Sequence, residues 1–276
     1  MNYWSYLSRL LMGKRMIFAK SQKDLDKMRD VGELIAEVRE ALREKVQIGI
    51  TTLELNKIAE KMIRDAGALP TFIGYHGFPF AICASVNEEV VHGFSKDVPL
   101  KEGDILSVDM AATFNGFVGD TAVTIPVGKI DDDSQQLLKV TEECLNLGIA
   151  AAKVGGNVGD IGFAVQEHAL KFNYGIVRGY TGHGIGRKMH EDPQIPNYGR
   201  KGTREKIRHG YCFAIEPMIN AGSHETSTLK DGWTVVTKDG KNSAHFEHTI
   251  AILETGTEIL TLTKKQKAQL RKVQTA

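Results

Sequence analysis

The segment Ile105-Leu-Ser-Val-Asp109-Met-Ala-Ala-Thr-Phe-Asn115-Gly116-Phe-Val-Gly-Asp120-Thr-Ala-Val-Thr124 has the pattern of a β-hairpin that carries two carboxylates. Asn115-Gly116 is the strongest short-range signal for a two-residue type I′ turn, because both turn positions require positive φ. With that turn, Phe114 pairs with Phe117 and Ala111 pairs with Asp120. Asp109 then projects from the same face as Asp120. Diagonal neighbours of this kind have Cα atoms about 7–8 Å apart, close enough to bind one metal ion or share two.

Asp109 also stands within an apolar run. Two carboxylates facing each other there would repel and lose hydration unless a cation neutralised them. The alternative, on this hairpin alone, is a solvated strand face, which is normal in antiparallel sheets.

Further elements follow from periodicity and capping signals. Apolar residues recur at helical spacing from 25 to 42, and Thr51-Thr52-Leu53-Glu54 is typical of a capping box opening a second helix that ends near Gly67. Two more helices are expected at about 134–153 and 160–172. Strands are expected at 105–113, 117–127, 211–219, 233–237 and 245–253.

The two halves of the chain resemble each other. Residues 102–110 and 209–218 share a pattern in which a strand ends in a carboxylate, and a later strand in each half carries another. The identities are few, so chance similarity is the alternative. A duplication predicts a pseudo-twofold α+β domain in which the pair Asp109 and Asp120 meets the pair Glu216 and Glu247 centrally.

Three further polar residues complete a candidate metal site. His183 lies between glycines in Thr181-Gly-His-Gly-Ile-Gly186, while Glu216 and Glu247 lie in apolar strands. A buried Glu needs a partner, either an Arg or a shared metal ion. Four carboxylates and one imidazole suit two Mn²⁺, Fe²⁺ or Co²⁺ ions better than the nitrogen- and sulfur-rich shells typical of zinc. Two such ions activate water and stabilise an oxyanion, which is hydrolytic chemistry.

The order Asp109, Asp120, His183, Glu216, Glu247 resembles the five-ligand signature of the type I, bacterial-style methionine aminopeptidases of the pita-bread superfamily. Supporting motifs are Gly74-Tyr-His-Gly-Phe-Pro79, Ser85-Val-Asn-Glu-Glu-Val-Val-His-Gly93, Met189-His-Glu-Asp-Pro193 and Phe246-Glu-His-Thr249. The resemblance covers about 17–263, and no long insertion separates His190 from Glu216. It implies a pita-bread fold, with a central antiparallel sheet and helices on its outer face.

The resemblance also implies a domain organisation. Residues 1–16 would be an N-terminal extension without an assigned role, 17–263 one catalytic domain with halves at about 17–130 and 131–263, and 264–276 a C-terminal tail. The first residues contain Arg9, are too short to span a bilayer and lack the features of a signal peptide.

The site roles follow from the same resemblance. Asp109 would bind one metal ion, Asp120 and Glu247 would bridge both ions, and His183 with Glu216 would complete the ligand shell of the other ion. Glu216 would also pass a proton. His190 would hold the scissile carbonyl and oxyanion, and His92 would contact the peptide and its leaving amine.

A pocket for a methionine side chain is implied as well. The residues at its positions are Tyr75, Phe78, Cys83, Met189, Trp233 and Phe72. Phe72 departs from the family, where cysteine is frequent. Aromatic and sulfur-bearing walls suit a thioether. Asn87, Glu89 and Ser243 match a peripheral site for Na⁺ or K⁺. The two divalent ions would be Co, Mn, Fe or Zn.

Composition limits the partners. Lys+Arg number 35 against 34 for Asp+Glu, so we expect no specific DNA binding. Cys83, Cys144 and Cys212 are too far apart in sequence to suggest a disulfide framework, which favours a reducing, cytoplasmic setting. No stable membrane insertion is expected. The expected substrates are N-termini of nascent polypeptides at the ribosome, and the expected state is a monomer.

The predicted activity is removal of N-terminal methionine before a small second residue. One alternative is a related X-Pro aminopeptidase, against which the short chain and the pocket motifs argue. The other is a catalytically silent pita-bread binding protein. Such a protein is expected to lack at least one ligand, whereas all five are present.

Overall fold

The computed structural model describes residues 16–274, so the N-terminal extension expected at 1–16 lies outside the described residues except for Met16. The helices are α2 (Gln22–Lys45), α3 (Thr52–Asp65), the 3-10 helix η1 (Tyr75–Gly77), α4 (Asp132–Ala151), α5 (Val158–Leu170) and α6 (Lys264–Gln274). The strands are β1 (Leu69–Pro70), β2 (Ile82–Val86), β3 (Glu89–Val91), β4 (Ile105–Phe114), β5 (Phe117–Pro126), β6 (Gly175–Ile176), β7 (Gly182–Gly184), β8 (Glu191–Ile195), β9 (Cys212–Ile215), β10 (Met218–Asn220), β11 (Thr226–Thr228), β12 (Val235–Thr237), β13 (Ser243–His245), β14 (Glu247–Leu253) and β15 (Gly256–Ile259).

The predicted hairpin is present as β4 and β5. Phe114 pairs with Phe117 and Ala111 with Asp120, which confirms the predicted register. Asn115 and Gly116 form the turn with φ of 52° and 79°, as a type I′ turn requires. Asp109 and Asp120 therefore share one face of the sheet.

An antiparallel sheet with pseudo-twofold symmetry organises the molecule. Its strand order is β1-β4-β5-β14-β9-β7-β8, with β2 added beside β4 and β15 beside β14. The β4–β5 pair and the β9–β14 pair meet at the β5–β14 seam. Gly103 before β4 and Gly210 before β9 have φ of 93° and 80°. Their N–H groups donate to the matching positions Val127 O and Ile252 O.

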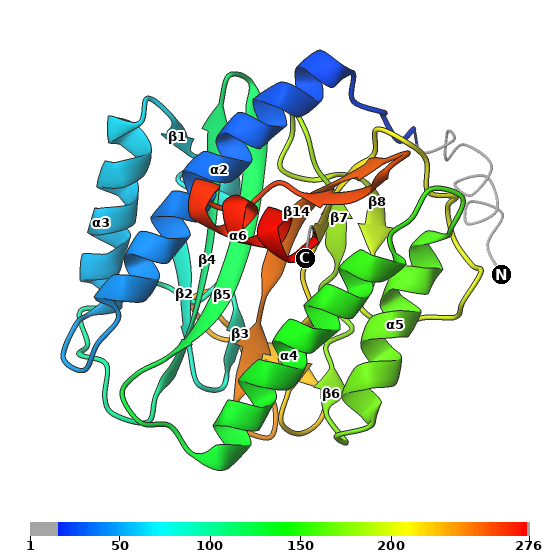
Figure 1. Ribbon diagram of the computed structural model, residues 1–276. Coiled ribbons are helices and arrows are strands. Elements are labelled where there is room, and N and C mark those ends of the chain that lie inside the picture. Colours follow the sequence, from blue (N-terminus) through cyan, green and yellow to red (C-terminus); the bar gives the residue numbers. More distant parts are fainter. Residues whose placement is uncertain (1–15, 275–276) are drawn as a thin grey trace, which may run out of the picture.

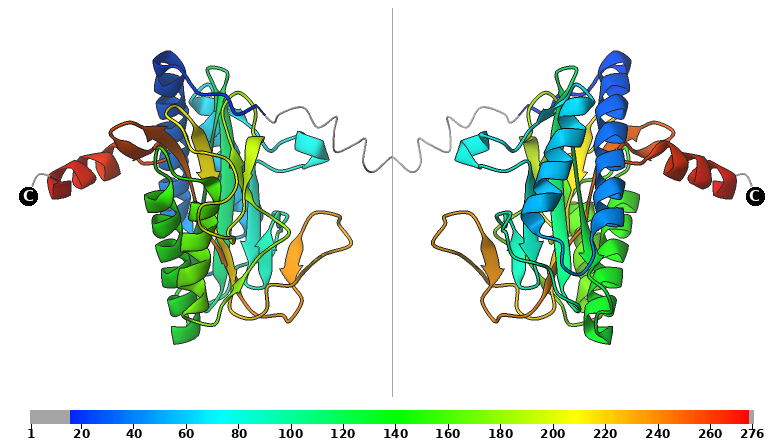
Figure 2. Two further views of the ribbon diagram at one scale, coloured as in Figure 1. Left: turned by 90° about the vertical axis from the view of Figure 1, so that its right-hand side faces the viewer. Right: turned by 90° about the vertical axis from the view of Figure 1, so that its left-hand side faces the viewer.

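The helices lie on one face of this sheet. Helices α2 and α3 cover the first half and α4 and α5 the second (Figure 1). Figure 2 shows these helices on one side of the sheet, while the β11–β12 hairpin projects from the other side. This arrangement confirms the predicted α+β pita-bread architecture.

Local chemistry explains the first two helices. Ser21 caps α2 in a capping box with Asp24, and Thr51 caps α3 in the predicted box with Glu54. Helix α2 approaches β5 closely at Gly119, where a Cβ atom would lie 3.2 Å from the backbone of Val31 and Gly32. A glycine directly before Asp120 thus allows the helix to pack on the strand that carries this carboxylate.

Two predicted strands are each divided. The strand expected at 211–219 ends as β9 and resumes as β10 after Glu216-Pro217, and the one expected at 245–253 is interrupted at Phe246. Proline has no N–H for the sheet ladder. Strands β10 and β13 pair with each other in a separate three-stranded sheet, whereas β9 and β14 belong to the large sheet. Both segments of the chain therefore pass from one sheet to the other at these interruptions, next to Glu216 and Glu247.

The C-terminal segment expected as a tail contains helix α6. Lys264 and Lys267 form ion pairs with Glu33 of α2 at 3.4 and 3.2 Å. The three cysteines are buried free thiols, as expected. None of the helices within residues 16–274 is both long and apolar enough to cross a bilayer.

Candidate metal and substrate site

A cavity of about 280 Å³ lies on the face of the sheet to which Asp120 points, since Gly119, the preceding residue of β5, faces helix α2. It is lined by every metal-binding, catalytic and pocket residue predicted from sequence: Asp109, Asp120, His183, Glu216, Glu247, His92, His190, Phe72, Tyr75, Phe78, Cys83, Met189 and Trp233. Five further residues complete the lining: His76, Val91, Tyr180, Thr181 and Met218.

Strand register brings the carboxylates together. Asp109 lies opposite Ala122 on β5, and Ala122 lies opposite Glu247 on β14. Asp120 is two residues from Ala122 and faces the same side. Thr249 Oγ1 donates to Asp120 O at 2.8 Å and accepts from Asp120 N at 3.1 Å. The side chain of Thr249 thus joins β14 to β5 beside the site.

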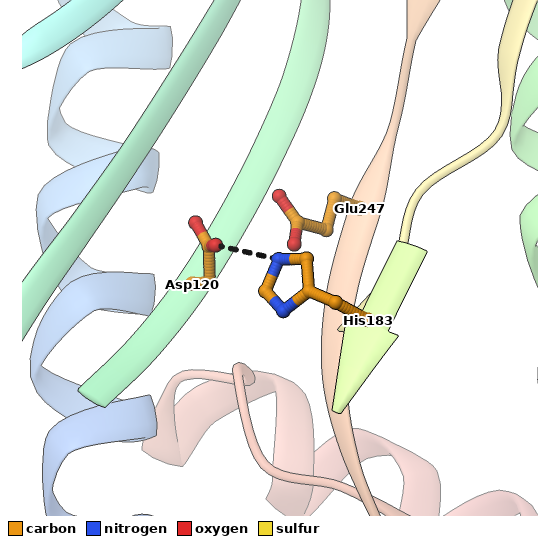
Figure 3. Close-up of side chains that lie close together, drawn as sticks. All are labelled: Asp120, His183 and Glu247. Carbon is orange, nitrogen blue, oxygen red and sulfur yellow. Dashed lines mark ion pairs between the residues drawn. The ribbon is translucent and has the colours of Figure 1, made fainter. Parts of the chain in front are cut away.

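His183 reaches the carboxylates from β7. A Cβ on Gly182 would lie 2.4 Å from Ala214 O, and one on Gly184 2.1 Å from Asp192 O, so both flanking positions require glycine. His183 Nδ1 lies 2.9 Å from Gly184 O. A proton on Nδ1 makes this bond and leaves Nε2 free as a ligand, the usual arrangement of metal-binding histidines. Nε2 lies 3.7 Å from Asp120 Oδ2 and 3.5 Å from Glu216 Oε1. Figure 3 shows Asp120, Glu247 and His183 pointing toward one another from three strands.

These groups fit a cationic ligand. Ligand atoms of Asp120, His183 and Glu247 lie within 4.8 Å of one another. Asp109 Oδ1, Asp120 Oδ1 and Glu247 Oε1 are buried without a hydrogen-bond partner, although buried polar atoms normally have one. Within residues 16–274, the ion-pair contacts of Asp120 and Glu216 are with histidines and not with an Arg that would neutralise them.

Electrostatics supports the same conclusion. Burial raises the pKa of Asp109 to about 7. Burial, followed by repulsion from neighbouring carboxylates, raises the pKa values of Asp120, Glu216 and Glu247 well above their usual range. Burial lowers the pKa of His183 to about 3, which keeps its imidazole neutral. Four carboxylates that resist ionisation and one neutral imidazole form a donor set that divalent cations stabilise.

Two more histidines face the carboxylates. His190 packs against His183 with ring centroids 4.3 Å apart. Burial lowers the pKa of His92 to about 4, with a contribution from His190. Burial and His76 lower the pKa of His190. Both rings are therefore neutral near pH 7, and a neutral imidazole has one donor and one acceptor nitrogen.

Aromatic rings form the apolar end of the cavity. Phe78 makes edge contacts with Phe72 at 6.2 Å and with Trp233 at 5.1 Å between centroids. Cys83 lies opposite Asp109 in the β2–β4 pair, so the pocket adjoins the carboxylates directly. The Phe72 ring, at the position where the family resemblance leads us to expect cysteine, is part of this wall.

The residues predicted for a monovalent cation lie outside the cavity. Ser243 N donates to Asn87 O at 2.9 Å, so these two residues are neighbours. Glu89 is engaged differently, because its carboxylate contacts the Lys96 ammonium and accepts from Val86 N. Asn87 and Ser243 are therefore adjacent in the structure, while the Glu89 carboxylate is occupied by Lys96 and Val86.

His245 was not singled out from the sequence. Its Nε2 is buried without a hydrogen-bond partner and lies 3.8 Å from Glu216 Oε2. Burial and His92 lower its pKa to about 3. The available signal was its position two residues before Glu247. In an extended strand that spacing places His245 on the same face as Glu247. Tyr180, whose ring lies 5.4 Å from that of His92, had no comparable signal.

Comparison with known proteins identifies the family. The model of metallopeptidase family M24 matches residues 26–254. Methionine aminopeptidase 1 of Bacillus subtilis (strain 168) is 50% identical over 246 residues, covering 89% of this chain and 99% of that protein. The crystal structure of methionine aminopeptidase from Rickettsia prowazekii superposes with a TM-score of 0.88 at 44% identity, covering 90% of this chain and 100% of that one.

The alternative of an X-Pro peptidase is not favoured. The prolidase from Pyrococcus horikoshii OT3 has a TM-score of 0.73 but 20% identity, and this chain covers 64% of that one. That likeness shows the fold alone. The chain belongs to metallopeptidase family M24 and, within it, to the methionine aminopeptidases, which are metal-dependent hydrolases.

Proposed function

We propose that this protein removes N-terminal methionine from polypeptides whose second residue is small, at a site that holds two divalent metal ions. The observation that carries the proposal is the position of the buried, unpartnered carboxylate oxygens beside a pocket lined by aromatic and sulfur-bearing side chains. Asp109, Asp120, His183, Glu216 and Glu247 would hold the ions. When bound, these ions activate water and stabilise negative charge on the attacked carbonyl.

The remaining side chains would orient the peptide. The first side chain would pack against the Phe78 and Trp233 rings, since a flexible thioether packs well against aromatic rings. His190 would donate a hydrogen bond to the carbonyl oxygen as it becomes negative, and His92 would contact the leaving amine. Glu216 would carry the proton of the attacking water toward that amine.

The selectivity for a small second residue has a steric basis. His92 and His190 line the cavity beside the carboxylates, where the second residue of the peptide must pass. A misfitted group at such a site costs about 1–3 kcal/mol, which is roughly 10–200-fold in kcat/KM.

We extend this proposal to the identity of the metal ions, the cellular compartment, the partners and the oligomeric state. Co, Mn, Fe or Zn would occupy the site, and Na⁺ or K⁺ would bind at the backbone of Asn87 and Ser243. The buried free cysteines suit a reducing cytoplasm. The near-zero net charge argues against specific DNA binding. We further infer that the protein acts as a monomer on nascent chains at the ribosome, with residues 17–263 as its catalytic domain.

One set of assays tests the proposal. The metal-depleted protein should be inactive and should regain activity when single metal ions are restored. Rates should then be highest for Met-Ala-Ser, with Met-Leu-Ser and Leu-Ala-Ser each reduced by about 10–200-fold. Equal kcat/KM values for the three peptides would contradict methionine selectivity, and faster turnover of an X-Pro peptide would favour the rejected alternative.

A further inference from the structure

Besides lining the pocket, Tyr75 makes a hydrogen bond to His190 through its hydroxyl group. Its hydroxyl oxygen lies 2.6 Å from His190 Nδ1. The two rings are 5.5 Å apart and inclined by 35°. Tyr75 lies in η1, and backbone bonds from Tyr75 N to Phe72 O and from Phe78 N to Tyr75 O, each 3.0 Å, hold its turn. A fixed turn therefore presents the hydroxyl to the imidazole.

The distance indicates which atom donates. N–H···O bonds span about 2.7–3.2 Å, whereas bonds donated by a hydroxyl group span about 2.5–3.0 Å. A separation of 2.6 Å thus fits a Tyr75 hydroxyl that donates to Nδ1. In a neutral imidazole one nitrogen donates and the other accepts. If Nδ1 accepts from Tyr75, the ring proton is on Nε2.

We propose that Tyr75 is a positioning residue that selects the Nε2–H tautomer of His190, so that His190 presents a hydrogen-bond donor to the substrate carbonyl. The opposite tautomer would present a lone pair to the developing oxyanion and would repel it. Since stabilisation of an oxyanion requires donors aimed at it before reaction, Tyr75 prepares the site for catalysis. This inference rests on the proposed role of His190.

Tyr180 offers a matched control. It is a second tyrosine that lines the same cavity, but its ring lies against His92, 5.4 Å away. Tyr180→Phe removes a hydroxyl from the cavity without removing the bond to His190. Tyr75→Phe keeps the aromatic wall and removes only the hydroxyl that this proposal requires.

The experiment uses full-length, Zn²⁺-loaded protein with ¹⁵N-labelled histidine, because Zn²⁺ is diamagnetic. Long-range ¹H–¹⁵N spectra distinguish the two tautomers, and loss of signals in His190→Gln assigns the ring. The wild type and Tyr180→Phe should show the Nε2–H form. Tyr75→Phe should show a mixture or the Nδ1–H form, with kcat for Met-Ala-Ser reduced about 3- to 10-fold, the effect of one hydrogen bond. KM should change less than about twofold, as expected for a transition-state interaction.

Three outcomes would overturn the proposal. They are an Nδ1–H form in the wild type, an unchanged tautomer in Tyr75→Phe, and a changed tautomer with unchanged kcat. Failure of the proposed function would look different, because wild-type protein would then release no methionine or His190→Ala would retain full kcat. In that case the spectra alone would still decide whether Tyr75 sets the tautomer.

Discussion

Replacing Asp109 by asparagine should have opposite effects on stability with and without metal. In the metal-free protein, burial raises the pKa of Asp109 from 3.8 to about 7. A raised carboxyl pKa means that the folded state holds the proton more tightly than the unfolded state does. The contribution of this group to stability is therefore complete below about pH 4 and is lost as the pH rises to about 7.

The size of the effect follows from the shift. A change of about three pKa units at about 1.36 kcal/mol each gives up to about 4 kcal/mol of lost stability above pH 7. Asparagine has nearly the same shape and does not ionise. The free energy of unfolding of metal-free Asp109→Asn should therefore exceed that of the wild type by up to about 4 kcal/mol at pH 8 and by little at pH 4.

Metal ions should reverse this order. A ligand at 1,000 times its Kd stabilises the folded state by about 4.1 kcal/mol, so two bound ions would outweigh the difference of about 4 kcal/mol. The amide is a weaker ligand than the carboxylate, so the variant should gain less and should also lose metal content and turnover. Calorimetry of the wild type and the variant at pH 4 and pH 8, with and without Mn²⁺, measures their stability under all four conditions. A metal-free variant less stable than the wild type at pH 8 would refute the electrostatic reasoning.

Three other substitutions test separate parts of the site. His190→Ala should lower kcat about 10²–10³-fold with unchanged metal content by elemental analysis, and a loss below tenfold would contradict an oxyanion role. Arg39→Met should lower the free energy of unfolding, measured by urea denaturation, by about 2–5 kcal/mol, because buried hydrogen bonds to Thr121 Oγ1 and Thr261 O are lost. An unchanged urea midpoint would show that these bonds are dispensable. Gly184→Ala should lower Tm and metal affinity because its Cβ would lie 2.1 Å from Asp192 O, whereas at Gly179 a Cβ meets nothing within 4 Å. Equal Tm values for these two alanine variants would argue against the close approach at β7.

Local sequence signals predicted much of this architecture because the physics behind them is local. The Asn115-Gly116 turn fixed the register of β4 and β5, and that register placed Asp109 and Asp120 on one face. The Thr51 capping box predicted the start of α3 correctly. The short strands were missed because they carry no period of their own; β7 comprises three residues, two of them glycine.

The residues that surround the metal ligands were harder to predict. Tyr75 and His190 are 115 positions apart, and no sequence pattern in either segment predicts their hydrogen bond. His245 lies near Glu216 because β13 pairs with β10, where His245 is opposite Met218, and that pairing of distant segments has no local sequence signal. Such contacts depend on which distant segments of the chain pack together, and the periodicity of one segment carries no information about that.

The position of the site at the seam between the halves explains why its surroundings are so polar. Strands β5 and β14 pair through only two residue pairs, Glu247 with Ala122 and His248 with Thr121. Side chains extend this short ladder: Thr121 Oγ1 donates to Glu247 O at 2.9 Å and Thr124 Oγ1 to His245 O at 2.9 Å.

Behind the same seam, the buried Arg39 guanidinium donates to Thr121 Oγ1 at 2.7 Å. The backbone that carries Asp120 and Glu247 is therefore held from the helical face by a cation, while its carboxylates face the cavity. Strand pairing alone would join the two halves here through two residue pairs, so the side-chain bonds add links between the halves at the point where their carboxylates meet.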